Sequence, residues 1–130
     1  MSEPKHAPAA AVVVTPQEAA AAEARVCAAY ATVRQAVLLQ THADGGDDPV
    51  AVTAVAANAR LAMAAGGAYL LARLDPATPP PLAAAVRSFA EVLEDIAMNA
   101  LAGVPNEDPA QATRLREAEV ASARVADFCS

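Results

Sequence analysis

Residues 80–103 read PPLAAAVRSFAEVLEDIAMNALAG, and this stretch decides the fold class. Apolar side chains recur in it at steps of three and four residues, which places them on one face of an α-helix. This stripe consists of Leu82, Val86, Phe89, Leu93, Ile96 and Ala100. Prolines open the stretch and Gly103 closes it, as is typical of helix boundaries. The sequence therefore predicts a core helix over residues 80–102.

The same kind of helix start occurs elsewhere along the chain. A capping residue stands directly before proline at Thr15, Asp48 and Asp108, and Thr78 with Pro79 gives a similar start before the third helix. Two glycines end the first segment, a proline cluster ends the second and Gly103 ends the third. The predicted helices are residues 16–42, 49–74, 80–102 and 109–128. Because the turns between them are too short for crossovers, the predicted fold is all-α, a four-helix up-down-up-down bundle.

The other three predicted helices carry weaker apolar stripes. In the first helix the stripe is Val26, Tyr30, Val33 and Val37. In the second it consists mostly of small residues, Val52, Val55, Ala59, Ala62, Gly66 and Tyr69. In the fourth it is Leu115, Ala118, Ser122 and Val125.

The composition agrees with one helical domain. Alanine, the best helix former, makes up 38 of the 130 residues. A chain of this length supports one core, so we expect a single four-helix domain over residues 15–130. Residues 1–14 are rich in alanine and proline without helical periodicity, and we expect them to form a disordered leader.

The charge balance argues against two classes of partner. The formal net charge is -6 and Lys5 is the only lysine. Nucleic acids and anionic membrane surfaces both require clustered basic residues, so we expect neither as a partner. The early apolar run, residues 9–14, is far shorter than the ~20 residues that cross a bilayer. We therefore expect no membrane span in this chain, and no signal peptide is visible.

Two cysteines lie at matching heights in the predicted bundle. The first and fourth helices are antiparallel neighbours in this topology, which brings Cys129 close to the level of Cys27. We therefore predict a disulfide between them, which would tie the C-terminus to the first helix and close a loop of about a hundred residues. The alternative is two unrelated residues, with Cys27 a small core side chain and Cys129 a free thiol.

The inventory of reactive side chains favours a protein that is not an enzyme. Of the two histidines, His6 lies in the leader, and His42 lies about 22 Å along the first helix from Cys27, too far for a Cys-His pair. Acidic clusters at 44–48 and 91–95 lack the ligand pattern of a calcium loop. The sequence therefore predicts no catalytic residue, no metal and no cofactor.

Residues 64–69, AAGGAY, place two glycines inside the second predicted helix. Each costs about 1 kcal/mol relative to alanine, so something should offset the penalty. Close helix packing at Gly66 is the explanation we favour. The alternative is a cavity for a hydrophobic ligand lined by Tyr30, Met63, Gly66 and Tyr69, although their helical spacing is also typical of plain core residues.

Two long stretches resemble a known group of proteins. These are residues 26–44, VCAAYATVRQAVLLQTHAD, and residues 55–119, which begin VAANARLAMAAGGAYLLARLDPATPPPL. They resemble mycobacterial alanine- and proline-rich membrane-associated proteins, in which such a domain follows a proline-rich cytoplasmic segment and one transmembrane helix. The resemblance covers about residues 27–129 and implies an extracytoplasmic domain. It carries no catalytic residues, and this chain departs from it in having no membrane span before Pro16.

Taken together, these observations predict a non-enzymatic helical domain of the cell envelope. The leading hypothesis is that it binds another envelope protein, whose identity the sequence does not specify. The alternative is a carrier or sensor of a hydrophobic small ligand held between helices. A disulfide would agree with an extracytoplasmic location, because disulfides persist in oxidising compartments.

Overall fold

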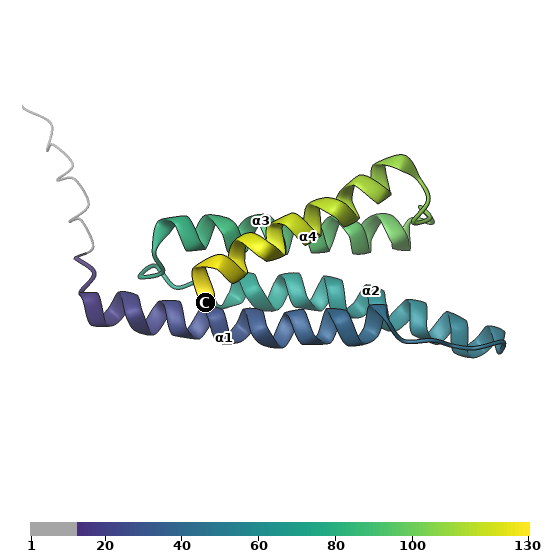
Figure 1. Ribbon diagram of the computed structural model, residues 1–130, viewed down its shortest axis with the longest axis horizontal. Coiled ribbons are helices and arrows are strands. Elements are labelled where there is room, and N and C mark those ends of the chain that lie inside the picture. Colours follow the sequence, from purple (N-terminus) through teal and green to yellow (C-terminus); the bar gives the residue numbers. More distant parts are fainter. Residues whose placement is uncertain (1–12) are drawn as a thin grey trace, which may run out of the picture.

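The computed structural model describes residues 13–130, which form four α-helices joined by three loops (Figure 1). Helix α1 spans Pro16–Thr41, α2 spans Pro49–Ala72, α3 spans Pro80–Leu101 and α4 spans Pro109–Cys129. Residues 13–130 contain no strand. The predicted all-α, four-helix fold is confirmed. The expected disordered leader, residues 1–14, lies outside the described residues except for Val13 and Val14.

Each helix begins at the proline that the sequence predicted. Thr15, Asp48 and Asp108 each accept a hydrogen bond from a backbone N–H two or three residues further on, at 3.0–3.1 Å. The start of α3 differs, because its N-cap is Pro79, which has no capping side chain. The hydroxyl of Thr78 instead accepts from the backbone N–H of Asp75 at 3.1 Å and closes the preceding turn. Thr78 therefore shapes the loop rather than the helix.

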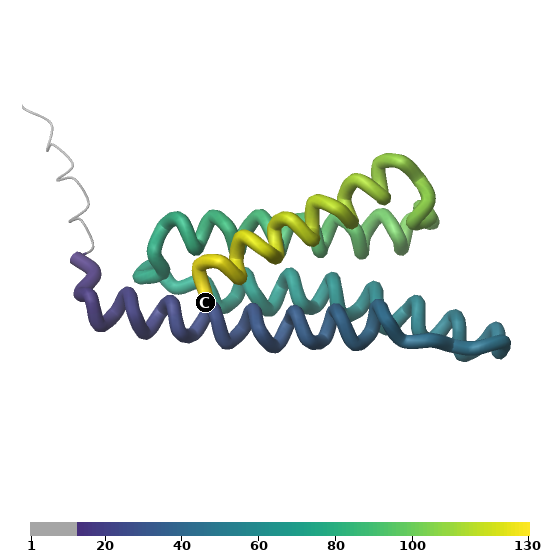
Figure 2. The backbone as a smooth tube through the Cα atoms, viewed as in Figure 1, coloured from purple at the N-terminus to yellow at the C-terminus, as the bar shows by residue number. Residues whose placement is uncertain are grey.

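Consecutive helices run antiparallel and pack side by side, in the order α1, α2, α3 and α4 (Figure 2). The core lies between them and is densest on α3. The predicted α3 stripe is buried from Leu82 to Ile96, and Val26, Tyr30 and Val33 of α1 are buried as predicted. Tyr30 meets Phe89 edge to face, with ring centroids 5.8 Å apart.

Helix α4 closes the bundle at one end only. It packs against α3 and crosses it obliquely, so that its first half stands away from α1 (Figure 1). Gln111, fully buried in the first turn of α4, donates a hydrogen bond to the carbonyl of Ile96 on α3 at 3.0 Å. The last turns of α4 then reach α1, which leaves a groove between the two helices.

Helix α2 projects beyond its neighbours. Its first turns extend past the ends of α1 and α3, with the α1–α2 loop running beside them (Figure 1). The first buried residue of α2 is Met63. The predicted α2 stripe is therefore wrong at both ends. Val52 is 49% exposed because α3 does not reach it, and Tyr69 is 38% exposed because the buried face runs through Gly66 and Leu70 instead.

Candidate functional site

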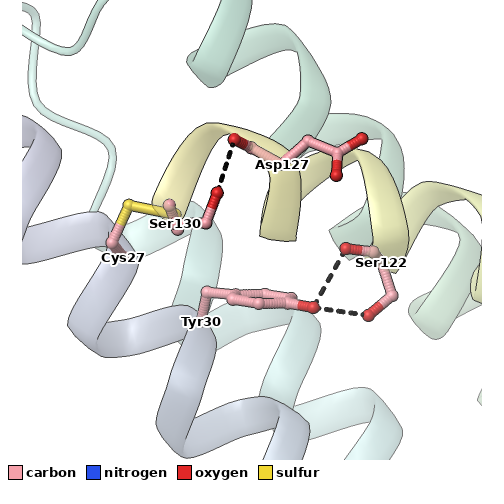
Figure 3. Close-up of a disulfide and its surroundings, with 6 residues drawn as sticks. Cys27, Tyr30, Ser122, Asp127 and Ser130 are labelled. Carbon is pink, nitrogen blue, oxygen red and sulfur yellow. Dashed lines mark hydrogen bonds between the residues drawn. A yellow bond between two sulfur atoms is a disulfide. The ribbon is translucent and has the colours of Figure 1, made fainter.

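A disulfide joins α1 to the end of α4, as the cysteine heights predicted. Cys27 and Cys129 are bonded, with their Cα atoms 5.5 Å apart (Figure 3). One turn along α1, the hydroxyl of Tyr30 donates to the carbonyl oxygen of Ser122 at 2.9 Å and lies 2.7 Å from Oγ of the same serine. The covalent bond and the tyrosine together fix the last two turns of α4 on α1. Neither cysteine is a free thiol.

The four residues predicted to line a ligand cavity do not meet in one. Tyr30 is buried in the core and borders the α1–α4 groove. Gly66 and Tyr69 border a different groove, between α1 and α2, and Met63 borders neither. Tyr69 also lies under the guanidinium of Arg73, which is 3.2 Å from its ring centroid. These four residues therefore do not line either groove together.

The two glycines of α2 face two different neighbours. A Cβ at Gly66 would lie 2.8 Å from Cγ1 of Val33 on α1. A Cβ at Gly67 would lie 2.7 Å from the backbone oxygen of Ala90 on α3. Both distances are shorter than real Cβ contacts, so close packing accounts for both glycines. Close helix packing, the explanation favoured for Gly66 from the sequence, agrees with this geometry. Gly67 lies where α2 contacts the backbone of α3.

The α1–α4 groove is the larger of these two surface hollows, with a volume of about 480 Å³. Its floor is formed by Phe89 and Leu93 of α3, and Tyr30 stands at one side. Arg34 of α1 and Glu119 of α4 lie on its rim. The groove exists because α4 diverges from α1.

The outer face of α2 is apolar and exposed. We use this name for Val50, Ala54, Ala57, Leu61, Ala65 and Ala68, which follow one another at steps of three and four residues. Val50 is 76% and Leu61 64% exposed. This face lies opposite the buried one, which carries Met63 and Gly66. Helix α2 is therefore apolar on two opposite sides, and only one of them is covered.

Helix α2 is also unusual in its charge. Arg60 is the only charged side chain among its 24 residues. By length and composition alone, α2 is the one helix within residues 13–130 that could cross a membrane. Only 17% of its apolar window is buried in this domain, whereas the core helix of a soluble protein is mostly buried. The expectation of no membrane span rested on the early apolar run at 9–14 and did not include this helix.

The acidic clusters and His42 form no site in this structure. Residues 13–130 hold no group of three or more His, Cys, Asp or Glu side chains placed to bind a metal ion. The ring nitrogen Nδ1 of His42 lies 2.8 Å from the carbonyl of Leu38, one turn back in its own helix. This geometry fits a residue that ends a helix.

Searches of protein-family models, curated proteins and solved structures found no match to this chain. The outer face of α2 was not predicted from the sequence. The sequence nevertheless contains a signal for this face, because a 24-residue helix with a single charge has no polar face to turn towards water.

Proposed function

We propose that this chain is a non-enzymatic helical domain of the mycobacterial cell envelope that acts by binding another protein. The observation that carries this proposal is the exposed outer face of α2. A helix that is apolar all round is normally covered on every side, and exposed apolar patches typically mark interaction sites. The partner is an envelope protein that covers this face.

The surface beside the outer face suits a helix as its ligand. A groove of about 370 Å³ runs between α1 and α2, and Leu61 and Ala65 form part of its wall. Thr32, Ala36 and Gln40 line the α1 side, and no ionisable carboxylate or cation lines either side. An uncharged groove between two helices, with small residues in its walls, accommodates the apolar face of a third helix.

The location in the envelope is supported by the disulfide and by the resemblance to membrane-associated proteins. Disulfides of this kind persist in oxidising compartments and are rare in the cytosol. The absence of enzymatic activity is supported by the chemistry of the described residues. Cys27 and Cys129 are bonded to each other, and His42 contacts its own helix rather than a nucleophile.

Site-specific photo-cross-linking tests the proposed function. A photoreactive amino acid at Ala65, on the outer face, should form adducts with a polypeptide in mycobacterial cell-envelope extract, because the bound partner covers this position. The matched control is the same amino acid at Ala84, an exposed residue on α3. Adducts that form equally at both positions, or at neither, would contradict the proposed function.

A second candidate function is supported by the α1–α4 groove. Its volume of about 480 Å³ falls within the range of small-molecule sites, and Tyr30 and Phe89 give it an aromatic floor and side. Under this alternative the domain carries a hydrophobic small molecule. Solvent extraction of the purified protein followed by mass spectrometry tests it. A bound lipophilic compound that is lost on Leu93→Arg, but retained on Ala84→Arg, would support the carrier function.

A further inference from the structure

We infer that the α1–α4 groove binds a single-chain amphiphile with a zwitterionic head, in which an anionic group and an ammonium group lie close together. This inference rests on the second candidate function, because it takes the groove as the site of a hydrophobic small molecule. It adds the chemical class of the ligand and the residues that recognise its head.

The interior of the groove is apolar. Phe89 and Leu93 of α3 form its floor, Val37 of α1 stands on one side and Ala118 of α4 on the other. A volume of about 480 Å³ suits a small ligand with one apolar chain. Burial of that chain on the floor supplies affinity but no preference for a particular head group, which has to come from the rim.

Two opposite charges stand at the same level of the rim. Arg34 lies on the α1 side and Glu119 on the α4 side, and both side chains are exposed. The hydrogen bond from Tyr30 to Ser122 marks where the two helices touch (Figure 3). Arg34 follows Tyr30 by four residues and Glu119 precedes Ser122 by three. Because α1 and α4 are antiparallel, both charges lie about 5 Å from that contact towards the open end of the groove, at 1.5 Å per residue.

This pair of charges selects the head group. A purely anionic head would pair with Arg34 but lie beside the Glu119 carboxylate, and a purely cationic head would meet the reverse conflict. A zwitterionic head avoids both conflicts. Its phosphate or carboxylate accepts hydrogen bonds from the guanidinium of Arg34, and its ammonium group donates to the carboxylate of Glu119.

The third charged residue of the lining, Asp127, lies too far away to contribute to this pair. It follows Glu119 by eight residues, which is about 12 Å along α4, and it stands on the closed side of the Tyr30–Ser122 contact. That closed end is fixed by the Cys27–Cys129 bond and by the buried Tyr30. The two rims are therefore held in place before binding, which reduces the entropic cost of binding.

Isothermal titration calorimetry with the oxidised full chain tests the inference. The probes are four compounds with a ten-carbon chain, each used below the concentration at which it forms micelles. Decanoyl lysophosphatidylethanolamine is zwitterionic, decanoate anionic, decylamine cationic and decanol neutral. We expect the zwitterion to bind most tightly, with a Kd at least about threefold below that of decanol, since two exposed ion pairs contribute.

Neutral variants of the two rim residues should shift the preference in opposite directions. Arg34→Gln should raise the Kd of the zwitterion about two- to fivefold and lower that of decylamine, because the like charge is removed. Glu119→Gln should also weaken the zwitterion but tighten decanoate. Neither variant should change the Kd of decanol. A merely structural effect of these substitutions would weaken all four compounds together.

The matched controls are Arg124→Gln and Glu117→Gln. Both residues are exposed and line a different hollow, between α3 and α4, so these variants change the net charge equally without touching the groove. They should leave the order of the four Kd values unchanged.

The same titrations separate this inference from the carrier function on which it rests. If decanol binds as tightly as the zwitterion, or if the rim variants behave like their controls, the zwitterionic head is refuted and the carrier function stands. If none of the four compounds binds, and solvent extraction recovers no lipophilic compound from the purified protein, the carrier function and this inference both fall.

Discussion

Replacing Gly67 with alanine tests how closely α2 and α3 are packed. The new Cβ would lie 2.7 Å from the backbone oxygen of Ala90 and 2.6 Å from Cγ of Glu94, whereas ordinary contact begins at 3.4 Å. The glutamate can move, but the carbonyl belongs to a helix, so α2 and α3 must separate. Overpacking of this kind costs about 1 to 3 kcal/mol.

The substitution also stabilises the helix itself, and this gain in free energy must be subtracted from the cost of overpacking. Alanine is about 1 kcal/mol better than glycine inside a helix. Because the Gly67 contact involves backbone, we place its cost in the upper part of the range and expect a net loss of about 1 to 2 kcal/mol. For a domain of this size, that loss lowers the melting temperature by about 3 to 10 °C. At Gly66 the obstacle is the Val33 side chain, so Gly66→Ala should change the unfolding free energy by less, about 0 to 1 kcal/mol.

Urea unfolding of the oxidised protein, followed by circular dichroism, measures these differences. All variants are compared at one low protein concentration, so that association does not contribute. Ala68→Gly, at the next and exposed position, is the control for helix propensity and should cost about 1 kcal/mol. A Gly67→Ala protein that is more stable than the wild type would refute the close approach of α2 and α3.

Two other predictions concern the ends of α4. Reduction of the Cys27–Cys129 bond, or the double Cys→Ser variant, should lower the unfolding free energy by about 4 to 5 kcal/mol in the chain-entropy model, because the bond spans 102 residues. If two thiols of the non-reduced folded protein can be alkylated, the predicted disulfide is absent. Gln111→Leu should cost about 0.5 to 1.5 kcal/mol in urea unfolding because it removes the buried side-chain hydrogen bond from α4 to the Ile96 carbonyl, whereas Thr113→Ala on the exposed face should cost less than half of that.

The sequence predicted the helix starts because their determinants are local. A proline at the first position, with an oxygen-bearing side chain before it, satisfies the first turn within a few residues, as at Asp48 and Asp108. The α3 stripe was equally predictable, because the polar residues on the opposite side of the helix show which face turns inward. The pairing of Cys27 with Cys129 followed from helix lengths and connectivity alone.

The orientation of α2 could not be predicted in the same way. With Arg60 as its only charge, no polar face marks the side that meets water, so the stripe through Val52 and Tyr69 looked as good as the true one. The α1–α4 groove could not be predicted from the sequence either. It depends on the angle at which α4 crosses α3, and Gln111 helps to set that angle through a contact 15 residues away in sequence.

The bond between Cys27 and Cys129 makes most of this chain a covalent ring, because it joins the first helix to the last (Figure 3). All three interhelical loops lie within that ring. A protease that cuts one of them therefore opens the ring without releasing a fragment, and the helices on both sides of the cut remain tethered. Two separate cuts, or one cut followed by reduction, are needed to divide the domain. In a compartment where peptidases are present and reductants are scarce, such a domain tolerates a first nick and keeps its parts at high effective concentration for re-association.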